Sequence, residues 1–391
     1  MKKMHYIGYC FAAEEKNEYL CNVASNLKMH YVAGAAKQAG YDVTMVSLCK
    51  TSSGGFRRAS VNQSEDISIY HIASTGKGAF LHKLFNLIIF YAQIIVYFLF
   101  NVKKDDHVIL YHSVRPTHII SKLLKFKNAD NVILEVEEIY ANAADGVKDY
   151  LDKEIKDIKK YRNYIFVNDF IPATYEIPKD RYIVVYGSYD HKNMSVEKFD
   201  SNKIHVLYAG AIEKLNGGAF TAIETARHLP ANYVMHILGK GNDADVSDAV
   251  EKIKNINEEC GCEKIVYSGF LSGEALDVYM SKCDIGVATY KIMDKYSNFV
   301  FPSKLVSYMC HNLKIVTGRS ECYENAAISK EWYFYDDNDF ISIADAIVCA
   351  ASDNGKADSS QIIKKLNEEL IYDLNGFLNG RLIGERKMDE S

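Results

Sequence analysis

One stretch of the chain places a lysine at a predicted helix start, residues 301–318, FPSKLVSYMCHNLKIVTG. Pro302 and Ser303 open a short helix, Lys304 lies in its first turn, and an apolar strand follows. Ser307 lies one turn later, on the same helix face as Ser303 and Lys304. Free backbone N–H groups and an ammonium group at a helix N-terminus favour phosphate binding. The pattern predicts a site for a nucleotide diphosphate, with a solvated surface lysine as the alternative.

Three further loops carry glycine directly after predicted strands. The first is YAGAIEKLNGGAF over 208–220, the second is Gly-Lys-Gly at 239–241, and the third is Ser-Gly-Phe at 268–270. Glycine lets backbone N–H groups approach a phosphate closely, and the third loop could pair with a nucleobase while Phe270 or Leu271 lies on its ring. Each loop is alternatively an ordinary turn. The candidate nucleotide-binding residues are Gly210, Lys214, Gly217, Gly218, Gly239, Lys240, Ser268, Gly269, Phe270, Ser303, Lys304 and Ser307.

The first half of the chain has charged side chains at the ends of two predicted strands. In NVILEVEEIYANA, Glu135 and Glu137 share one face at a strand end and Glu138 lies just beyond. Buried unpaired carboxylates are costly, so these residues are either cleft groups or partners of the basic helix that follows. In ILYHSVRPTHII, His112 and Arg115 follow another strand. The histidine is either a polar cleft residue or a hydrogen-bonded structural one.

Composition narrows the class of protein. With 391 residues the chain exceeds one typical core, and 48% hydrophobic with 25% charged residues is ordinary for a soluble globular protein. The net charge of -5 argues against a nucleic-acid partner. No second Cys/His pair at zinc spacing follows Cys260-Gly261-Cys262, and Asp243 and Asp245 stand at a helix start. We therefore expect no metal site and a reducing cytoplasmic location.

An uncharged apolar segment runs from Leu84 to Phe100, flanked by Lys83 and by the pair 103–104. It is shorter than the about 20 residues that a membrane span needs, and Asn86 and Gln93 interrupt it. Its apolar residues surround a helix without forming one clean stripe. Three interpretations stay open: a buried helix, a helix on a membrane surface, and a span.

Short apolar runs alternate with helical stretches along the whole chain, which predicts an α/β protein with doubly wound parallel sheets. A polar stretch without periodicity, 187–202, lies between the two halves. We expect two Rossmann-like domains facing each other across a cleft, 1–190 with a tail of about 360–391 packing back, and 191–360. Ligands in such sheets bind at the carboxyl ends of the strands. The predicted strands are 5–9, 41–48, 67–72, 108–111, 132–136, 164–167, 182–186, 204–209, 233–238, 264–267, 284–288, 314–317 and 332–335.

The order YAG…GG, LGKG, SGF and FPSKLVSYM…KIVTG, from Lys203 to Gly318, resembles the C-terminal domain of GT-B glycosyltransferases, most closely family 4. The first half is similar only in pattern. The resemblance implies the GT-B fold, a nucleotide-sugar held mainly by the second domain, and no metal or other cofactor. It also implies retention of anomeric configuration, whereas a carboxylate acting as general base would suit inversion. A last helix within 359–374 would cross back to the first domain.

The chain departs from the family pattern at three places. Ala211 stands where the family commonly has an arginine, Asn216 where it has a lysine, and Ser307 where it has a ribose-binding glutamate. Lys214 and Lys304 are left to supply the positive charge. Glu137 falls where the first domain of the family often has a histidine near the donor sugar. We therefore name Glu137 and Lys304 as catalytic candidates, and His112, Arg115, Glu135 and Glu138 as acceptor-side candidates.

The expected activity is transfer of a sugar from a UDP- or GDP-sugar to a glycan or lipid-linked acceptor in cell-envelope polysaccharide biosynthesis. The expected location is the cytoplasm, with 84–100 as the segment that would contact the inner face of the plasma membrane. Two alternatives remain: a non-catalytic GT-B subunit that supports a partner transferase, and a GT-B sugar-nucleotide epimerase.

Overall fold

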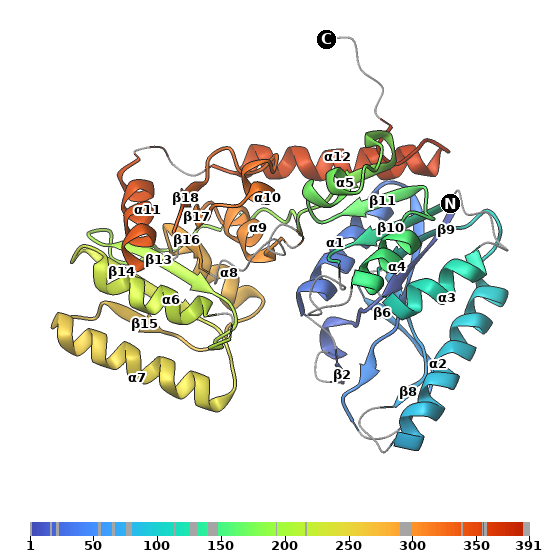
Figure 1. Cartoon of the computed structure of the whole chain (residues 1–391), viewed down its shortest axis with the longest axis horizontal. Coiled ribbons are helices and arrows are strands. Elements are labelled where there is room, and N and C mark those ends of the chain that lie inside the picture. Colours follow the sequence, from blue (N-terminus) through green and yellow to red (C-terminus); the bar gives the residue numbers. More distant parts are fainter. Residues whose placement is uncertain are drawn as a thin grey trace, which may run out of the picture. The chain divides into compact units, whose positions relative to one another are not determined.

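The computed structural model describes residues 2–15, 18–20, 23–53, 56–64, 67–75, 80–112, 114–124, 131–139, 148–192, 194–215, 217–289, 299, 301–337, 339–353, 355 and 358–385. The side chains of 23, 64, 75, 80–86, 114–117, 124 and 148–150 lie outside this description. The chain divides into two compact units, Met1–Ser188 with Asn367–Ser391, and Tyr189–Leu366. Each unit contains one large sheet with helices packed on it (Figure 1).

The first unit is built on a sheet in the order β12-β11-β10-β9-β1-β3-β7-β6. Its paired strands run parallel except for β6, which is antiparallel to β7. The chain builds outward from β1 on one side and then from β9 on the other, so the strand order reverses between these two strands. The strands are β1 (Lys2–Gly8), β3 (Tyr41–Ser47), β6 (Ser60–Ser64), β7 (Ile67–His71), β9 (His107–Tyr111), β10 (Val132–Val136), β11 (Asn163–Phe166) and β12 (Tyr182–Val184).

Helices and short strands complete the first unit. Two small antiparallel pairs, β2 with β4 and β5 with β8, are formed by the connections between strands of the large sheet. They are β2 (Tyr19–Leu20), β4 (Lys50–Thr51), β5 (Phe56–Arg57) and β8 (Ser74–Thr75). The helices are α1 (Val23–Gln38), α2 (Phe80–Asn101), α3 (Val114–Leu124), α4 (Lys148–Ile158) and α5 (Phe170–Thr174), with 3-10 turns η1 (Ala13–Glu15) and η4 (Lys179–Arg181).

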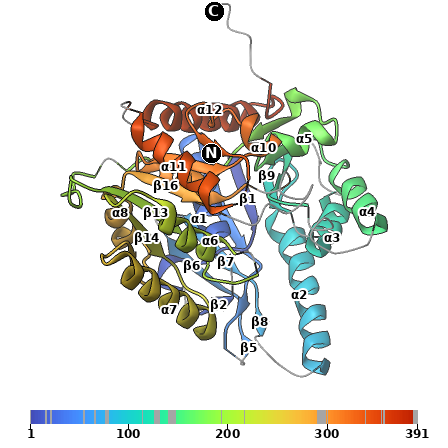
Figure 2. The same cartoon turned by 60° about the vertical axis from the view of Figure 1, so that its left-hand side comes forward.

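The apolar segment 84–100 lies within α2, at the outer side of the first unit (Figure 2). Gln93 anchors the helix, since its side chain accepts the N–H of Ala73 at 2.6 Å and donates to the carbonyl of Ala73 at 3.0 Å. One face is buried through Ile94, Tyr97 and Phe98, while the opposite face is exposed. The segment is therefore not buried on all sides, as the first of the three interpretations would require. Among the described residues, no helix is both long and apolar enough to cross a membrane.

The second unit is built on a parallel sheet in the order β15-β14-β13-β16-β17-β18. Here too the strand order reverses in the middle, between β13 and β16. The strands are β13 (Ile204–Ala209), β14 (Tyr233–Leu238), β15 (Ile265–Tyr267), β16 (Ile285–Ala288), β17 (Lys314–Gly318) and β18 (Tyr333–Tyr335). The helices are α6 (Gly218–Thr225), α7 (Asp243–Cys260), α8 (Glu274–Ser281), α9 (Ser303–Cys310), α10 (Glu321–Glu324) and α11 (Phe340–Ser352), with 3-10 turn η5 (Ala226–His228).

Side chains alternate across this second sheet and pack against helices on both faces. Val206 and Val287 belong to the core under α6, α7 and α11. Leu207 and Gly286, which are register partners, point the other way, and the ring of Tyr308 in α9 packs directly over Gly286. A Cβ at Gly286 would overlap that ring, so α9 can approach the strand only because this residue is glycine.

One helix, α12 (Ser360–Leu378), contributes to both units. Its residues from Asn367 onward belong to the first unit. Asn367 accepts a hydrogen bond from Tyr31 at 2.6 Å, Asn375 donates to the carbonyl of Ala39 at 2.9 Å, and Lys2 donates to the carbonyl of Leu378 at 2.7 Å. The final helix thus ends four residues beyond the predicted range 359–374.

Candidate functional site

The reversal of strand order between β13 and β16 marks the place in the second unit where an open parallel sheet binds ligands. Gly210 directly follows β13 and Thr289 directly follows β16. The Thr289 hydroxyl donates to the carbonyl of Gly218 at 2.6 Å, which ties the end of β16 to the start of α6. The loops that the sequence singles out therefore meet at the carboxyl ends of these two strands.

Lys304 lies at this reversal point. Its ammonium nitrogen is 4.2 Å from the centroid of the Tyr208 ring, and a Cβ at Gly210 would lie 3.0 Å from it. Burial lowers the pKa of Lys304 to about 8. Within the part of the chain that the structure describes, no carboxylate pairs with this ammonium group. A desolvated, unpaired cation at a ligand-binding edge is suited to an anionic ligand.

Tyr308, which the sequence reasoning missed, fixes the helix that carries Lys304. Its hydroxyl accepts the backbone N–H of Ala209, the last residue of β13, at 2.8 Å. It also donates to the carbonyl of Val287 in β16 at 3.4 Å. The hydroxyl therefore links α9 to both central strands one turn beyond Lys304. A tyrosine inside an apolar helix face gives no sign of this role in sequence.

Gly217 and Gly218 form a tight start to α6. Gly217 has φ 67°, which is left-handed backbone, and it caps the helix. A Cβ at Gly218 would lie 2.6 Å from the carbonyl oxygen of Thr289 and 2.7 Å from the hydroxyl of Tyr208. Only glycine allows the helix start to approach the ends of β13 and β16 this closely. Asn216 lies outside the described residues.

Close packing of backbone explains why glycine stands at both ends of the Gly-Lys-Gly loop. A Cβ at Gly239 would overlap the carbonyl oxygen of Gly210, and one at Gly241 would overlap that of Ile212. Backbone hydrogen bonds join the two loops, from Gly210 N–H to the carbonyl of Leu238 at 2.9 Å and from Ile212 N–H to that of Lys240 at 3.0 Å. The loop after β14 therefore supports the loop after β13 directly.

The loop 268–270 lies against the Gly-Lys-Gly loop. Gly239 N–H donates to the carbonyl of Gly269 at 2.9 Å, and Gly269 has φ 73°. The Phe270 ring is about half exposed, and the Lys240 ammonium lies 4.6 Å from its centroid. An exposed aromatic ring beside a cation, at the carboxyl edge of the sheet, can lie on a nucleobase.

A buried hydrogen-bonded chain, absent from the sequence prediction, supports Ser268. Its hydroxyl is 2.8 Å from that of Tyr279, which is 2.8 Å from Nδ1 of His236. His236 Nε2 is in turn 2.8 Å from Nδ1 of His205. Burial, followed by the neighbouring His205, lowers the pKa of His236 to about 4, so the imidazole is neutral at physiological pH. The four residues are spread over positions 205–279, so the sequence does not reveal their association.

Two predicted nucleotide-binding residues have other partners. The ammonium of Lys214 pairs with the carboxylate of Asp248 in α7, at an exposed position. The Ser307 hydroxyl donates to the carbonyl of Ser303 at 3.2 Å within α9, and Ser303 itself is exposed. The structure thus brings Lys304 and the glycine loops together, whereas Lys214 pairs with Asp248.

In the first unit, Glu135 is fully buried at the carboxyl end of β10. Tyr6 donates its hydroxyl hydrogen bond to Oε2 of Glu135, and Oε1 has no partner among the residues described. Burial, followed by the charge of Glu137, raises the pKa of Glu135 to about 8. Glu135 is therefore mainly protonated at neutral pH and can act as a hydrogen-bond donor.

Glu137 follows the same strand and is partly exposed. It accepts a charged hydrogen bond from Lys28 of α1, whose ammonium also donates to the carbonyl of Val185 at 2.6 Å. Lys28 is buried, and sequence reasoning did not identify it. The only sequence signal is a lysine on the inward side of an otherwise apolar helix. Glu138, the next residue in the chain, is partly buried.

The remaining acceptor-side candidates lie at the end of β9. His112 Nε2 is 2.7 Å from a carboxylate oxygen of Glu154 in α4, and both residues are buried. This pairing satisfies one ring nitrogen of a buried histidine. Arg115 belongs to α3, and its side chain lies outside the described residues.

A further polar cluster follows strands β1 and β7 of the first unit. Nε2 of His71 is 2.9 Å from Oε2 of Glu15 in η1, and the His71 ring stacks on Tyr19 with centroids 4.5 Å apart. The guanidinium of Arg57 lies 4.8 Å from the centroid of the Tyr19 ring. These residues come from separate loops, so their spacing in sequence carries no signal.

By sequence, the chain matches no protein-family model and no curated protein. By structure, it is similar over 97% of its length to 97% of trehalose-6-phosphate synthase from E. coli bound with UDP-2-fluoro glucose, at 9% identity and TM-score 0.65. It is similar over 96% of its length to 95% of sucrose-phosphate synthase from Thermosynechococcus elongatus, at 13% identity and TM-score 0.65. It is also similar over 96% of its length to the whole of Anabaena HepE in complex with UDP and glucose, of which 100% is covered, at 10% identity and TM-score 0.61. With its two Rossmann-like units, the chain has the GT-B fold.

Proposed function

We propose that this chain is a nucleotide-sugar-dependent glycosyltransferase of the GT-B class that holds the donor diphosphate with Lys304. The observation that carries the proposal is the desolvated ammonium of Lys304, which lies beside Gly210 at the reversal point of the second sheet. Solved GT-B structures with UDP-2-fluoro glucose or with UDP and glucose support the choice of ligand class. The order of the four loops supports a family 4 type.

The reaction proposed is cleavage of the bond between the sugar's anomeric carbon and the diphosphate, with transfer to an acceptor hydroxyl. Negative charge builds on the departing diphosphate. Lys304 and the helix start at Gly217 and Gly218 would stabilise that charge, and removal of one such contact usually costs ~10²-fold or more in rate. Following the family pattern, we propose retention of configuration without a metal, with the leaving phosphate taking the proton of the acceptor.

On the acceptor side we propose a role for Glu137, which its hydrogen bond with Lys28 orients at the carboxyl end of β10. It would contact the donor sugar or the acceptor near the reacting carbon. Glu135 behind it, protonated and bonded to Tyr6, would contribute shape and a neutral donor to this edge. The proposed acceptor is a glycan or lipid-linked sugar of the cell envelope.

The exposed face of α2 supports the lipid-linked acceptor. Ile88, Val96, Leu99 and Phe100 are all more than half exposed on this helix, which carries no charge from Leu84 to Asn101. Exposed lysines at 103–104 follow its end. An apolar face next to cations fits a peripheral contact with anionic lipid at the cytoplasmic side of a membrane.

The test is thermal stabilisation of the full chain by UDP, GDP and their sugars. At 100 Kd a ligand stabilises by about 2.7 kcal/mol, and we expect one nucleotide series to do so. Lys304→Ala should cut the shift to about half or less, because about tenfold weaker binding leaves about 1.4 kcal/mol at the same ligand concentration. Lys254→Ala, a highly exposed lysine on α7, should keep the full shift. Glu137→Gln should keep the shift and lower turnover by ~10²-fold or more.

The outcomes separate the alternatives. No shift with any nucleotide would refute the transferase and favour the non-catalytic GT-B subunit. A shift that is unchanged in Lys304→Ala would refute the phosphate assignment. A nucleotide-dependent change of configuration in the sugar nucleotide itself, without an acceptor, would indicate an epimerase.

A further inference from the structure

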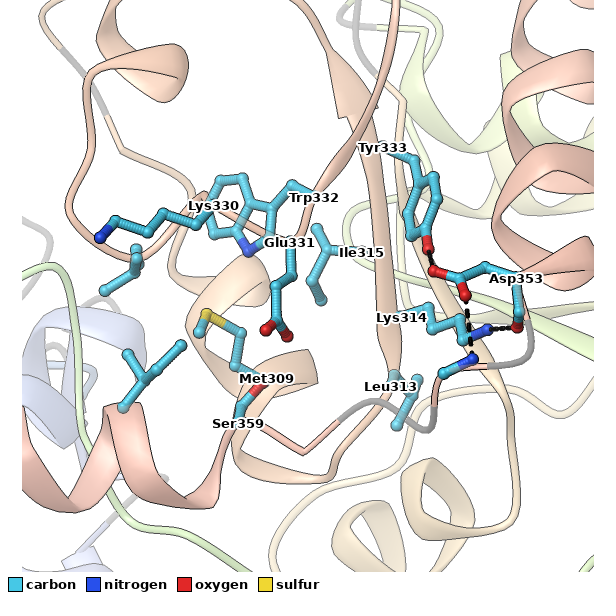
Figure 3. A pocket seen from close by; sticks show the side chains of 13 residues that line it. Met309, Leu313, Lys314, Ile315, Lys330, Glu331, Trp332, Tyr333, Asp353 and Ser359 are labelled. Carbon is cyan, nitrogen blue, oxygen red and sulfur yellow. Dashed lines mark hydrogen bonds between the residues drawn. The ribbon is translucent and has the colours of Figure 1, made fainter.

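A cavity of about 420 Å³ opens in the second unit at the amino-terminal ends of β17 and β18 (Figure 3). Met309 and Leu313 line it from the end of α9 and the following turn, and Trp332 lines it just before β18. The sheet is parallel, so this cavity lies at the opposite edge from Gly210, which follows the carboxyl end of β13. It is therefore separate from the proposed diphosphate site.

The cavity contains an unsatisfied hydrogen-bond donor. Trp332 is 8% exposed, and its indole Nε1 has no partner among the residues that the structure describes. In Figure 3 the nitrogen-bearing edge of the ring lies on the side of Glu331 and Met309. A buried donor without an acceptor is costly and needs an explanation. An acceptor atom of a bound molecule would supply one.

The same wall carries a free acceptor. Glu331 is exposed and forms no ion pair with any other described residue, and Figure 3 shows its carboxylate directed toward Ser359. Two of the other charged groups of the wall, Lys314 and Asp353, have partners, whereas Lys330 is exposed like Glu331. Lys314 donates to the carbonyl of Ala350 at 2.9 Å, and the Asp353 carboxylate accepts from Tyr333.

Six of the thirteen lining residues are apolar, and the charges of the wall cancel. Its apolar members are Met309, Leu313, Ile315, Ile328, Trp332 and Ile362. Lys330 and Glu331 carry opposite charges, as do Lys314 and Asp353. A neutral ligand is therefore favoured over an anion or a cation, and one that combines an apolar surface with groups that both donate and accept.

We propose that this cavity is an accessory binding site for one or two units of a neutral saccharide. A sugar hydroxyl can accept from the Trp332 indole and another can donate to the Glu331 carboxylate, while the C–H faces of the ring pack on Ile315 and Met309. The volume lies within the range of about 300–1,000 Å³ that small-molecule sites occupy. The site would hold a glycan chain away from the diphosphate site of the same unit.

Trp332 makes the test specific, since it is the chain's only tryptophan. Its fluorescence should change saturably when the full chain is titrated with glucose, maltose or cellobiose up to about 50 mM, the range for Kd values near 1 mM. Glu331→Gln should weaken binding by about tenfold or more, because hydrogen bonds to a charged group are the strong ones. Glu251→Gln, an exposed glutamate on α7, should leave the titration unchanged.

Calorimetry with Trp332→Phe gives a second readout, in which loss of the N–H should weaken binding while the ring packing stays. Lys304→Ala and saturating UDP should leave the saccharide response intact, so this proposal and the donor proposal fail separately. A flat titration with all three sugars would overturn the accessory site. So would an unchanged affinity in Glu331→Gln, or competition by UDP.

Discussion

At the scale of single residues, Lys304 lowers the stability of the fold and favours the binding of an anionic ligand. Its ammonium is desolvated against Tyr208 and the Gly210 backbone without a carboxylate partner among the described residues. Such a group costs stability and is retained where a ligand needs it. Its pKa of about 8 lies below the ordinary 10.5, which makes this cost measurable as a pH dependence.

We predict that Lys304→Met stabilises the protein by roughly 1–3 kcal/mol at pH 7. Between pH 8 and 10.5 the unfolded chain holds a proton that the folded lysine has lost, so wild-type stability rises with pH in this window. The variant lacks that rise. Urea unfolding at a series of pH values measures both effects, and a less stable Lys304→Met would contradict the desolvation argument.

Glu135 makes the opposite prediction. Its folded pKa of about 8 lies above the ordinary 4.5, so from pH 4.5 to 8 the unfolded chain ionises while the folded carboxyl stays protonated. Wild-type stability should therefore fall across this window as pH rises. Glu135→Gln, which still accepts from Tyr6, should lack this fall. If unfolding curves of the two proteins run parallel from pH 4.5 to 8, Glu135 is ionised in the fold.

At the scale of elements, the large sheets could be predicted from sequence because parallel strands buried on both faces appear as short apolar runs. Strands such as 132–136, 204–209 and 233–238 match the predicted bounds, and others differ by a few residues at their ends. β6 could not be predicted this way, since SVNQS is polar and pairs only at the edge of the sheet. The two-residue strands β2, β4, β5 and β8 carry no periodicity at all.

The site could be predicted only where backbone geometry demanded a residue type. Gly218 and Gly239 mark close approaches of backbone, and Gly217 has a left-handed φ of 67°. These glycines are visible as a pattern in sequence. The Lys28–Glu137 pair, the Glu15–His71 contact and the chain from Ser268 to His205 were not visible. Each depends on side chains that only tertiary packing brings together.

Gly239 tests the loop architecture. A Cβ in Gly239→Ala would overlap the Gly210 carbonyl oxygen, so the loops after β13 and β14 must separate. We predict a loss of roughly 1–3 kcal/mol in stability together with weaker nucleotide binding. Gly34→Ala in α1 is the matched control, because no atom lies within 4 Å of the added Cβ, and it should gain about 0.5–1 kcal/mol. Equal melting temperatures would contradict the predicted overlap.

The exposed face of α2 makes a prediction of its own. Val96→Asp with Leu99→Asp should abolish flotation of the protein with anionic liposomes, since it places charge on the apolar face. Val250→Asp, on an exposed valine of α7, is the control that should still float. If wild type does not bind the liposomes, or the double variant binds equally well, α2 is not a membrane contact.

At the scale of the whole molecule, the two units repeat one plan with different chemistry. In each, the order of parallel strands reverses in the middle of the sheet, at β1 and β9 or at β13 and β16. The first unit has carboxyl groups at the carboxyl end of its sheet. The second unit has a lysine and glycine turns at the carboxyl end of its own sheet. Similarity to solved GT-B structures at 9–13% identity shows that this plan persists when nearly all residues differ.

The central claim, that Lys304 binds the donor diphosphate, is tested most directly by calorimetric titration of wild type and Lys304→Ala with UDP and GDP. We predict saturable binding of one nucleotide to wild type, weaker by about tenfold or more in the variant. Above pH 8 the wild-type affinity should fall toward that of the variant, because the free lysine loses its proton there. Equal affinity of the two proteins, or an affinity that stays level from pH 7 to 9.5, would contradict the claim.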